Sequence, residues 1–270
     1  MRVAVKYYVL IFSLLLFSCE TNIENKVGNE IQNSETIEKS VMDTTSVIDS
    51  IVKEKRKPKQ KKLITYDSLS LEEYLIQFGL VDIQSIEPQI KVDLKYSTTD
   101  NFVGVDLYGE LNKAYCQPDM AVKLKKAYEY LQKEDSSLTL LVFDAVRPKS
   151  VQQKMWDTLK LPIREKTKFL SNPKNHSIHN YGVAVDISLS TKEGEELDMG
   201  TTFDYIGVLA HPREEQKLLK QGKLTQKQIE NRKLLRKVMK KAGFFNIQTE
   251  WWHWNSCNRS TAKRKYKLVR

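Results

Sequence analysis

The chain has no long hydrophobic run, and this absence decides how its first residues are interpreted. The most apolar segment, residues 9–17, follows Arg2 and Lys6 and is too short to cross a bilayer as a mature helix. A positive start followed by a short apolar stretch is typical of a secretory signal, with an uncleaved N-terminal anchor as the alternative. Either interpretation places the rest of the protein outside the cytoplasm.

Cysteine is also scarce, with three residues in the 270-residue chain. The segment LFSC, residues 16–19, resembles the lipobox of bacterial lipoproteins, in which the cysteine becomes the lipidated first residue. We therefore expect a lipoprotein signal peptide over residues 1–19 and an exported protein held at the envelope membrane by a lipid on Cys19. Cys116 and Cys257 then remain, and an exported location permits a disulfide between them, although the sequence does not decide whether they pair.

Residues 20–65 lack any sustained hydrophobic periodicity. They are polar at first and end near a basic block, KEKRKPKQKK, at residues 53–62. Such a segment cannot bury enough apolar surface to offset its ordering entropy, so we expect a disordered tether. The block and the C-terminal segment NRSTAKRKYKLVR both contribute to the net charge of +10. Because they flank the folded part of an exported chain, we expect no nucleic-acid partner. Two alternatives remain for these basic segments: they bind anionic envelope polymers or lipid headgroups, or their charges are solvated and have no partner.

Residues 66–270 lack both internal repeats and a regular alternation of strands and helices, and we expect them to form one domain with a basic C-terminal tail. Apolar spacing predicts helices over residues 120–133 and 150–161, a helix opened by a capping box of Thr225 and Gln228, and strands over residues 138–148, 183–189 and 244–254. This mixture predicts an α+β fold with helices packed on a mostly antiparallel sheet.

Histidine is rare too, and the four residues present are His176, His179, His211 and His253. His179 precedes a strand whose alternation places Val183, Val185 and Ile187 on one face and Asp186 on the other. A buried carboxylate needs a partner, and the turn between His179 and Asp186 would let the imidazole fold back towards it. A catalytic zinc site takes three protein ligands, and His253 is the obvious third, although these residue types also bind other divalent ions. We expect His176 in a loop and His211 at the surface.

Glu250 lies three residues before His253, close enough to hold a metal-bound water as a general base. A straight strand would put the two side chains on opposite faces. The hypothesis therefore requires a bulge or a strand end near Trp251 and Trp252. Each residue has an ordinary alternative, since a lone histidine is usually packed or exposed and a tryptophan pair usually belongs to a core.

Several segments resemble one family in sequence and in order. SIHNYGVAVDISL, residues 177–189, resembles the S-x-H-x2-G-x-A-x-D segment of the VanX-type D-alanyl-D-alanine dipeptidases, which are zinc DD-peptidases, and EWWHW, residues 250–254, resembles their E-x-W-H segment. VDLKYSTTDNFVG, DAVRP and MGTTFD, at residues 92–104, 144–148 and 199–204, match further motifs. The resemblance covers about residues 66–255.

The resemblance implies a role for each candidate residue. The zinc ligands would be His179, Asp186 and His253, holding one Zn2+ per chain, with Glu250 as the base, Arg147 as the oxyanion stabiliser, and Ser177 and Asp204 as residues that hold the dipeptide. Asp204 would pair with the free ammonium of the substrate, and its alternative is to cap the turn after Gly200. Arg147 has the alternative of a structural pair with Asp144. The implied fold is the compact α+β fold of zinc DD-peptidases (hedgehog/DD-peptidase-like).

The implied function is zinc-dependent hydrolysis of D-Ala-D-Ala in the bacterial envelope. The best-known members of the family are cytoplasmic, so the export signal leaves the substrate open. Two alternatives remain: a zinc D,D-carboxypeptidase or endopeptidase that acts on peptidoglycan stem peptides, and a non-catalytic envelope-binding protein on the same fold. The sequence gives no sign of the oligomeric state.

Overall fold

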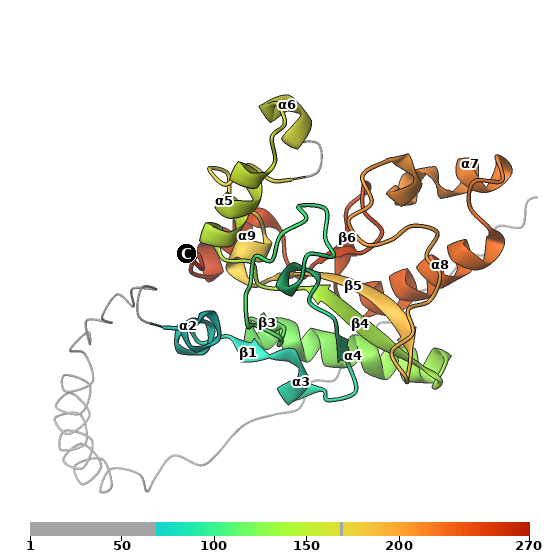
Figure 1. The fold of residues 1–270 in the computed structure, drawn as a ribbon. Helices are drawn as coiled ribbons and strands as arrows, with labels where there is room; N and C mark the ends of the chain where they lie inside the picture. Colours follow the sequence, from blue (N-terminus) through green and yellow to red (C-terminus); the bar gives the residue numbers. More distant parts are fainter. Residues whose placement is uncertain (1–68, 168–169) are drawn as a thin grey trace, which may run out of the picture. The chain divides into compact units, whose positions relative to one another are not determined.

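A five-stranded sheet runs through the middle of the described domain (Figure 1), and its strand order is β2-β4-β5-β7-β6. Its strands are β2 (Lys91–Val92), β4 (Leu138–Asp144), β5 (Ala184–Thr191), β7 (His253–Asn255) and β6 (Phe245–Asn246). The computed structural model describes residues 69–167 and 170–270, which belong to one compact unit. The expected signal peptide, the lipid site at Cys19 and the tether lie outside the described residues. No helix within those two ranges is long and apolar enough to cross a membrane.

The α+β class predicted from the sequence is confirmed, but the sheet is mixed rather than mostly antiparallel. β2 pairs in parallel with β4, with Lys91 opposite Leu141, whereas the other neighbouring strands pair antiparallel. The parallel pair arises because the chain returns to β4 through helix α4 (Pro118–Glu134), the kind of crossover that parallel neighbours require. β2 is two residues long, so no periodicity marked it in the sequence.

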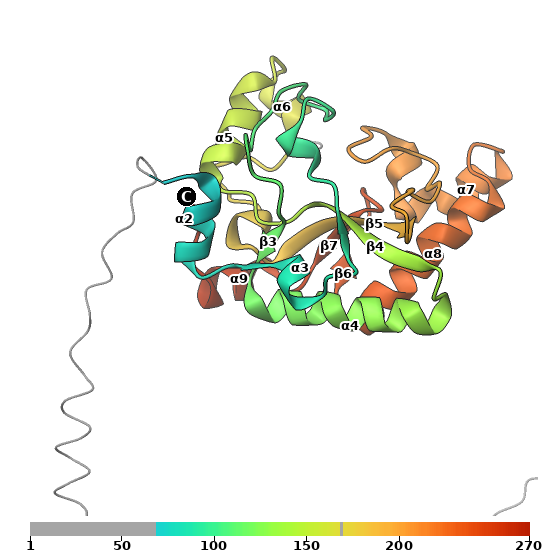
Figure 2. The same ribbon diagram turned by 60° about the horizontal axis from the view of Figure 1, so that its bottom comes forward.

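Two helices close one face of the sheet. α4 and α8 (Gln226–Lys241) pack against each other, α4 against β4 and α8 against β5 (Figure 2). The capping box of Thr225 and Gln228 is present at the start of α8, and Gly243 follows its end at φ +86°. Every residue of β4 and all but the last of β5 are buried, so the face that carries Asp186 is also covered.

The predicted strand over residues 244–254 is wrong in one respect, because it is broken. β6 ends at Asn246 and β7 begins at His253, and because the two strands pair antiparallel, the residues between them reverse the direction of the chain. The buried rings of Trp251 and Trp252 pack edge to face at 5.3 Å, and the indole nitrogen of Trp251 donates to Thr201 Oγ1 at 2.8 Å. The strand boundary that the Glu250 hypothesis required is therefore present.

The basic C-terminal segment packs on the domain. Val269 is buried, its N–H donates to the carbonyl oxygen of Asn180 at 2.8 Å, and its own carbonyl oxygen accepts from Lys149 N at 2.9 Å. The segment therefore supports the turn that contains His179. Cys116 and Cys257 are both free thiols. The remaining elements are α2 (Leu71–Phe78), β1 (Val81–Asp82), α3 (Ile83–Ile86), η2 (Lys95–Ser97), β3 (Tyr115–Cys116), α5 (Lys149–Thr158), α6 (Ile163–Lys166), η3 (His179–Tyr181), η4 (Val208–Ala210), η5 (Pro212–Glu214), α7 (Glu215–Lys220) and α9 (Arg259–Lys265).

Candidate metal centre

The register of the central strands brings Asp186 and His253 together. Asp186 of β5 lies directly opposite His253, the first residue of β7, and residues opposite each other in an antiparallel pair share one face of the sheet. Val185 and Ile187, which flank Asp186, point to the other face and are fully buried in the core. The alternation that builds the core therefore also aims Asp186 at His253.

His179 reaches the same place from a tight turn. It opens the 3-10 helix η3, which ends at Gly182 in the left-handed region at φ +67°. A Cβ atom on Gly182 would lie 3.2 Å from Leu80 Cδ2 and 3.4 Å from the backbone nitrogen of Gln117, so a side chain there would crowd Leu80 in addition to straining the backbone. The predicted turn between His179 and Asp186 is confirmed.

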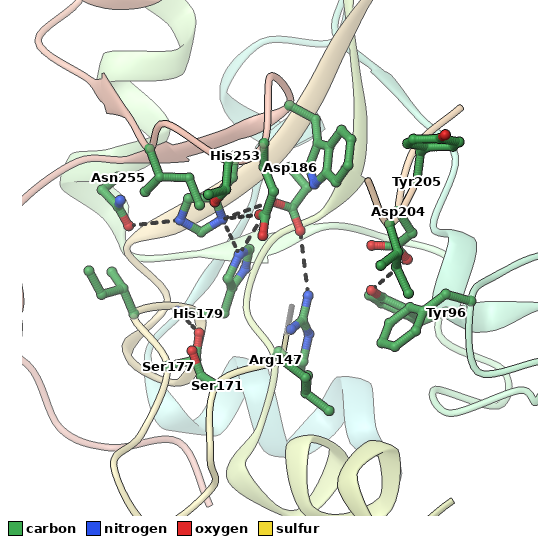
Figure 3. A pocket seen from close by; sticks show the side chains of 18 of the residues that line it. Tyr96, Arg147, Ser171, Ser177, His179, Asp186, Asp204, Tyr205, His253 and Asn255 are labelled. Atoms are coloured by element: carbon green, nitrogen blue, oxygen red, sulfur yellow. Dashed lines mark hydrogen bonds and ion pairs between the residues drawn. The ribbon is translucent and has the colours of Figure 1, made fainter. Parts of the chain in front are cut away.

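The three predicted ligands converge closely enough to share one ion (Figure 3). His253 Nδ1 lies 3.0 Å from Asp186 Oδ1 and 3.1 Å from His179 Nε2, and His179 Nε2 lies 3.4 Å from Asp186 Oδ1. Tetrahedral zinc with bonds of about 2.0–2.1 Å to nitrogen and oxygen places its ligands about 3.3 Å apart. The donor set therefore fits a tetrahedral ion with one position left open.

The outer nitrogens of both histidines are occupied, which fixes the atoms that face the centre. His179 Nδ1 donates to the carbonyl oxygen of Ala145 at 2.6 Å, and His253 Nε2 donates to Asn255 Oδ1 at 3.1 Å. The inner nitrogens then carry lone pairs, so two nitrogen acceptors and a carboxylate oxygen point at one another. A cation between these atoms would satisfy all three acceptors, and outer hydrogen bonds of this kind are typical of metal-ligating histidines.

Burial and charge shift the pKa values of the two carboxylates in opposite directions. Burial acts to raise the pKa of Asp186, but His179 and His253 outweigh burial and bring it far below its usual value. Burial raises the pKa of Glu250, against an opposing effect of His253. Asp186 is therefore suited to remain an anionic ligand, whereas Glu250 is the more basic of the two.

Glu250 stands beside the three ligands, at the edge of the cavity. Its Oε2 lies 3.9 Å from His253 Nδ1, and the side chain is partly exposed. The bend at Trp251 and Trp252 removes the strand alternation that would have sent Glu250 to the opposite face. A carboxylate at this distance can reach a water molecule that occupies the open position of the ion.

Arg147 forms the pair with Asp144 that was one of the two interpretations made from the sequence, and it also lines the cavity. Its Nε and Nη2 donate to Asp144 Oδ2 at 3.0 and 2.5 Å, which is the structural pair. Nη2 also lies 3.4 Å from Asp186 Oδ2, and Nη1 donates to Gln152 Oε1 at 3.2 Å. The guanidinium lines the cavity next to the ligands, so the pair with Asp144 holds it there.

Ser177 and Asp204 also line the cavity. Ser177 is buried, and its Oγ accepts from the backbone nitrogen of His179 at 3.3 Å. Asp204 adopts a left-handed backbone at φ +59°, and its Oδ2 accepts from Tyr96 Oη at 2.7 Å. It does not cap the turn at Gly200, because the nitrogen of Gly200 donates to Asp198 Oδ1 at 2.8 Å instead. Burial raises the pKa of Asp204, and the bond from Tyr96 opposes that rise.

The cavity has a volume of about 600 Å³ and is also lined by residues for which the sequence predicted no role in the site. His211, expected at the surface, is partly exposed and lines the cavity, and its Nδ1 has no hydrogen-bond partner in the described part of the chain. His176 lies in a loop, as expected, with Nδ1 3.3 Å from Tyr181 Oη. Asn255 could have been predicted from the sequence, because it lies two residues after His253 in the same strand and therefore on the same face. Lining residues that had no separate prediction include Tyr96, Ser171, Tyr205, Asn255 and Arg259.

Comparison with known proteins agrees with this geometry. Residues 77–269 match the family Peptidase M15, described as D-ala-D-ala dipeptidase. The D-alanyl-D-alanine dipeptidase of Escherichia coli (strain K12) is 31% identical over 174 residues, which cover 64% of this chain and 82% of that protein. Those of Enterococcus faecium and Enterococcus faecalis are each 27% identical, covering 66% and 65% of this chain and 92% and 90% of the respective proteins.

Proposed function

The chain belongs to the D-Ala-D-Ala dipeptidase family of metallopeptidases, and we propose that it hydrolyses the dipeptide D-Ala-D-Ala with one zinc ion per chain. The observation that carries the proposal is the convergence of His179, Asp186 and His253, whose ligand atoms all lie within 4.8 Å of one another. Zinc is favoured because two imidazoles and one carboxylate, with a fourth position for water, form a common set of ligands for catalytic zinc.

Glu250 is the residue that moves protons in this proposal. A bound zinc ion supplies Lewis-acid chemistry, in that it lowers the pKa of a water and polarises the scissile carbonyl. Glu250 accepts a proton from the water as its oxygen attacks the carbonyl carbon, and then delivers that proton to the leaving nitrogen as the C–N bond breaks. The products are two molecules of D-alanine. Burial raises the pKa of Glu250, which brings its basicity nearer to the value that proton transfer at neutral pH requires.

Arg147 stabilises the negative charge that develops on the carbonyl oxygen. Asp144 and Gln152 hold the guanidinium in place before substrate arrives, so little reorganisation is needed during the reaction. Removal of one such preorganised donor typically lowers kcat by about 10²–10³.

Asp204 and Ser177 hold the dipeptide. Tyr96 fixes the carboxylate of Asp204 by a hydrogen bond, and an ammonium group beside it would offset the burial that otherwise disfavours its charge. Ser177 offers a hydroxyl next to His179 on the opposite side of the ligand set. The free amino group of a dipeptide is the part of the substrate that Asp204 recognises.

The test compares the zinc-loaded wild-type protein with Glu250→Gln on two substrates, D-Ala-D-Ala and a stem pentapeptide that ends in D-Ala-D-Ala. We expect hydrolysis of the dipeptide by the wild type, little or none by Glu250→Gln, and no hydrolysis of the pentapeptide. Preference for the pentapeptide would replace the dipeptidase by a D,D-carboxypeptidase. Inactivity on both substrates with zinc bound would instead favour a non-catalytic binding protein.

The proposal extends to fold and location. We place the domain in the zinc DD-peptidase (hedgehog/DD-peptidase-like) fold, supported by the family and by helices packed on one side of a mixed sheet. We propose that the protein is an exported lipoprotein, supported by the segment LFSC at residues 16–19. Labelling cells with a fatty acid should mark the wild type and not Cys19→Ala, and equal labelling would remove this part of the proposal.

A further inference from the structure

Two arginines line the cavity, and they differ in how their charge is used. The buried Arg147 donates to Asp144 and Gln152. Arg259, the first residue of α9, is exposed and has no carboxylate within ion-pair distance among the described residues. Arg259 therefore brings an uncompensated positive charge to the cavity.

Backbone carbonyls hold one end of the Arg259 side chain. Its Nη1 donates to the carbonyl oxygens of Asn175 and His176, each at 2.9 Å. These two bonds use both hydrogens of Nη1 and leave Nε and Nη2, the edge that binds a carboxylate through two parallel hydrogen bonds. The guanidinium is thus positioned, but the part of it best suited to an anion is not used by these bonds.

The position of Arg259 in the cavity follows from the residues it contacts. His176 immediately precedes Ser177, whose Oγ accepts from the backbone nitrogen of His179. Figure 3 shows Ser171 and Ser177 on one side of the ligand set and Tyr96 and Asp204 on the other. Arg259 therefore belongs to the end of the cavity that lies away from Asp204.

The field at this end is positive. Burial lowers the pKa of His176, and the charges of Lys149, Lys263 and Arg259 lower it further. At the other end stand the carboxylate of Asp204 and the phenol of Tyr96. The cavity therefore has an acidic end and a basic end, with the ligand set between them.

We propose that Arg259 binds the C-terminal carboxylate of the substrate, so that the dipeptide lies with its ammonium at Asp204 and its carboxylate at Arg259 and Ser177. This inference rests on the proposed dipeptidase function and adds to it a residue that determines the preference for a free C-terminal carboxylate. The ammonium and the carboxylate of an extended dipeptide lie on opposite sides of its single peptide bond, so its scissile carbonyl can lie beside the ligand set while its charged ends, at most about 7 Å apart, point in opposite directions. A peptide with a blocked C-terminus loses the contact with Arg259.

The experiment measures kcat/KM for D-Ala-D-Ala and for its C-terminal amide. The proteins are the zinc-loaded full chain, Arg259→Gln, Arg259→Lys, and Arg264→Gln as the matched control. Arg264 is an exposed arginine of the same helix and does not line the cavity. We expect the wild type and Arg264→Gln to prefer the free acid by about 10- to 100-fold, the range of a hydrogen-bonded charge pair. Arg259→Gln should lose most of this preference, mainly through a higher KM for the acid, and Arg259→Lys should retain part of it.

The outcomes separate this inference from the function on which it rests. Cleavage of D-Ala-D-Ala by the wild type with the same preference for acid over amide in Arg259→Gln would overturn the role of Arg259 and leave the dipeptidase function standing. An equal loss on acid and amide in Arg259→Gln would show that Arg259 only holds the loop at residues 175–176, and would also overturn it. A zinc-loaded wild type that cleaves neither compound would end both proposals.

Discussion

Replacing Asn255 by alanine should weaken zinc binding although Asn255 is not itself a ligand. Asn255 Oδ1 accepts the Nε2–H of His253 at 3.1 Å, and this bond keeps the His253 Nδ1 lone pair directed at Asp186 and His179. A bound cation polarises the imidazole, so its N–H bond resembles a hydrogen bond to a charged group, which is worth about 1.5–3 kcal/mol or about a 10- to 100-fold change in a dissociation constant. Loss of an outer hydrogen bond at metal-ligating histidines typically has an effect of this size.

The assay titrates metal-free protein with Zn2+ in competition with a chromophoric chelator. Asn246→Ala is the matched control, because Asn246 lies on the neighbouring strand β6, donates to the carbonyl oxygen of Ile247 and does not line the cavity. Asn255→Asp should bind zinc at least as tightly as the wild type, since a carboxylate makes the imidazole more basic. If folded Asn255→Ala, checked by circular dichroism, binds zinc as tightly as the wild type, the assignment of the His253 nitrogens is refuted.

Four further substitutions test separate parts of the structure. Glu250→Gln should lower kcat for D-Ala-D-Ala by about 10²–10⁴ while the zinc content, measured by mass spectrometry, stays at one ion per chain; lost zinc would contradict a purely catalytic role. Gly182→Ala should lower the free energy of unfolding in urea by about 1–2 kcal/mol, because alanine disfavours φ +67°, and an unchanged value would argue against this backbone conformation. Tyr96→Phe should raise KM about 5- to 10-fold with a smaller effect on kcat, since Asp204 loses its hydrogen bond, and a change confined to kcat would count against substrate binding there. Thr225→Ala should cost about 1 kcal/mol of stability in urea by removing a helix cap far from the chemistry, with kcat/KM as in the wild type.

The ligand set was predictable because its signals are local. The alternation around Asp186 and the short turn after His179 each belong to a single segment of the chain, and the scarcity of histidine left few candidates for the third ligand. The resemblance to the dipeptidase family rests on the same segments. The sequence did not show that these segments lie next to each other. The β5–β7 register brings them together by pairing Asp186 with His253.

Features that depend on distant contacts escaped the sequence. The parallel pairing of β2 depends on where α4 returns the chain, and two residues carry no periodicity of their own. The position of His211 at the cavity depends on the packing of the loop that carries it, and the position of Arg259 depends on two carbonyl oxygens more than eighty residues earlier. The break before β7 was stated as a requirement, but the sequence did not show its cause, which is the antiparallel pairing of β6 with β7 and the chain reversal that this pairing needs.

The same β5–β7 register that folds the core also brings Asp186 and His253 together, so a protein with the wrong register would lack the site. Because side chains alternate along β5, a slip of one residue against β7 would send Asp186 into the layer occupied by Val185 and Ile187, and would bring those two side chains to the cavity. Such a misfolded form would bury an unpaired charge and expose apolar surface, so it would tend to aggregate. Molecules that stay soluble are therefore those in which the same register also brings Asp186 and His253 together.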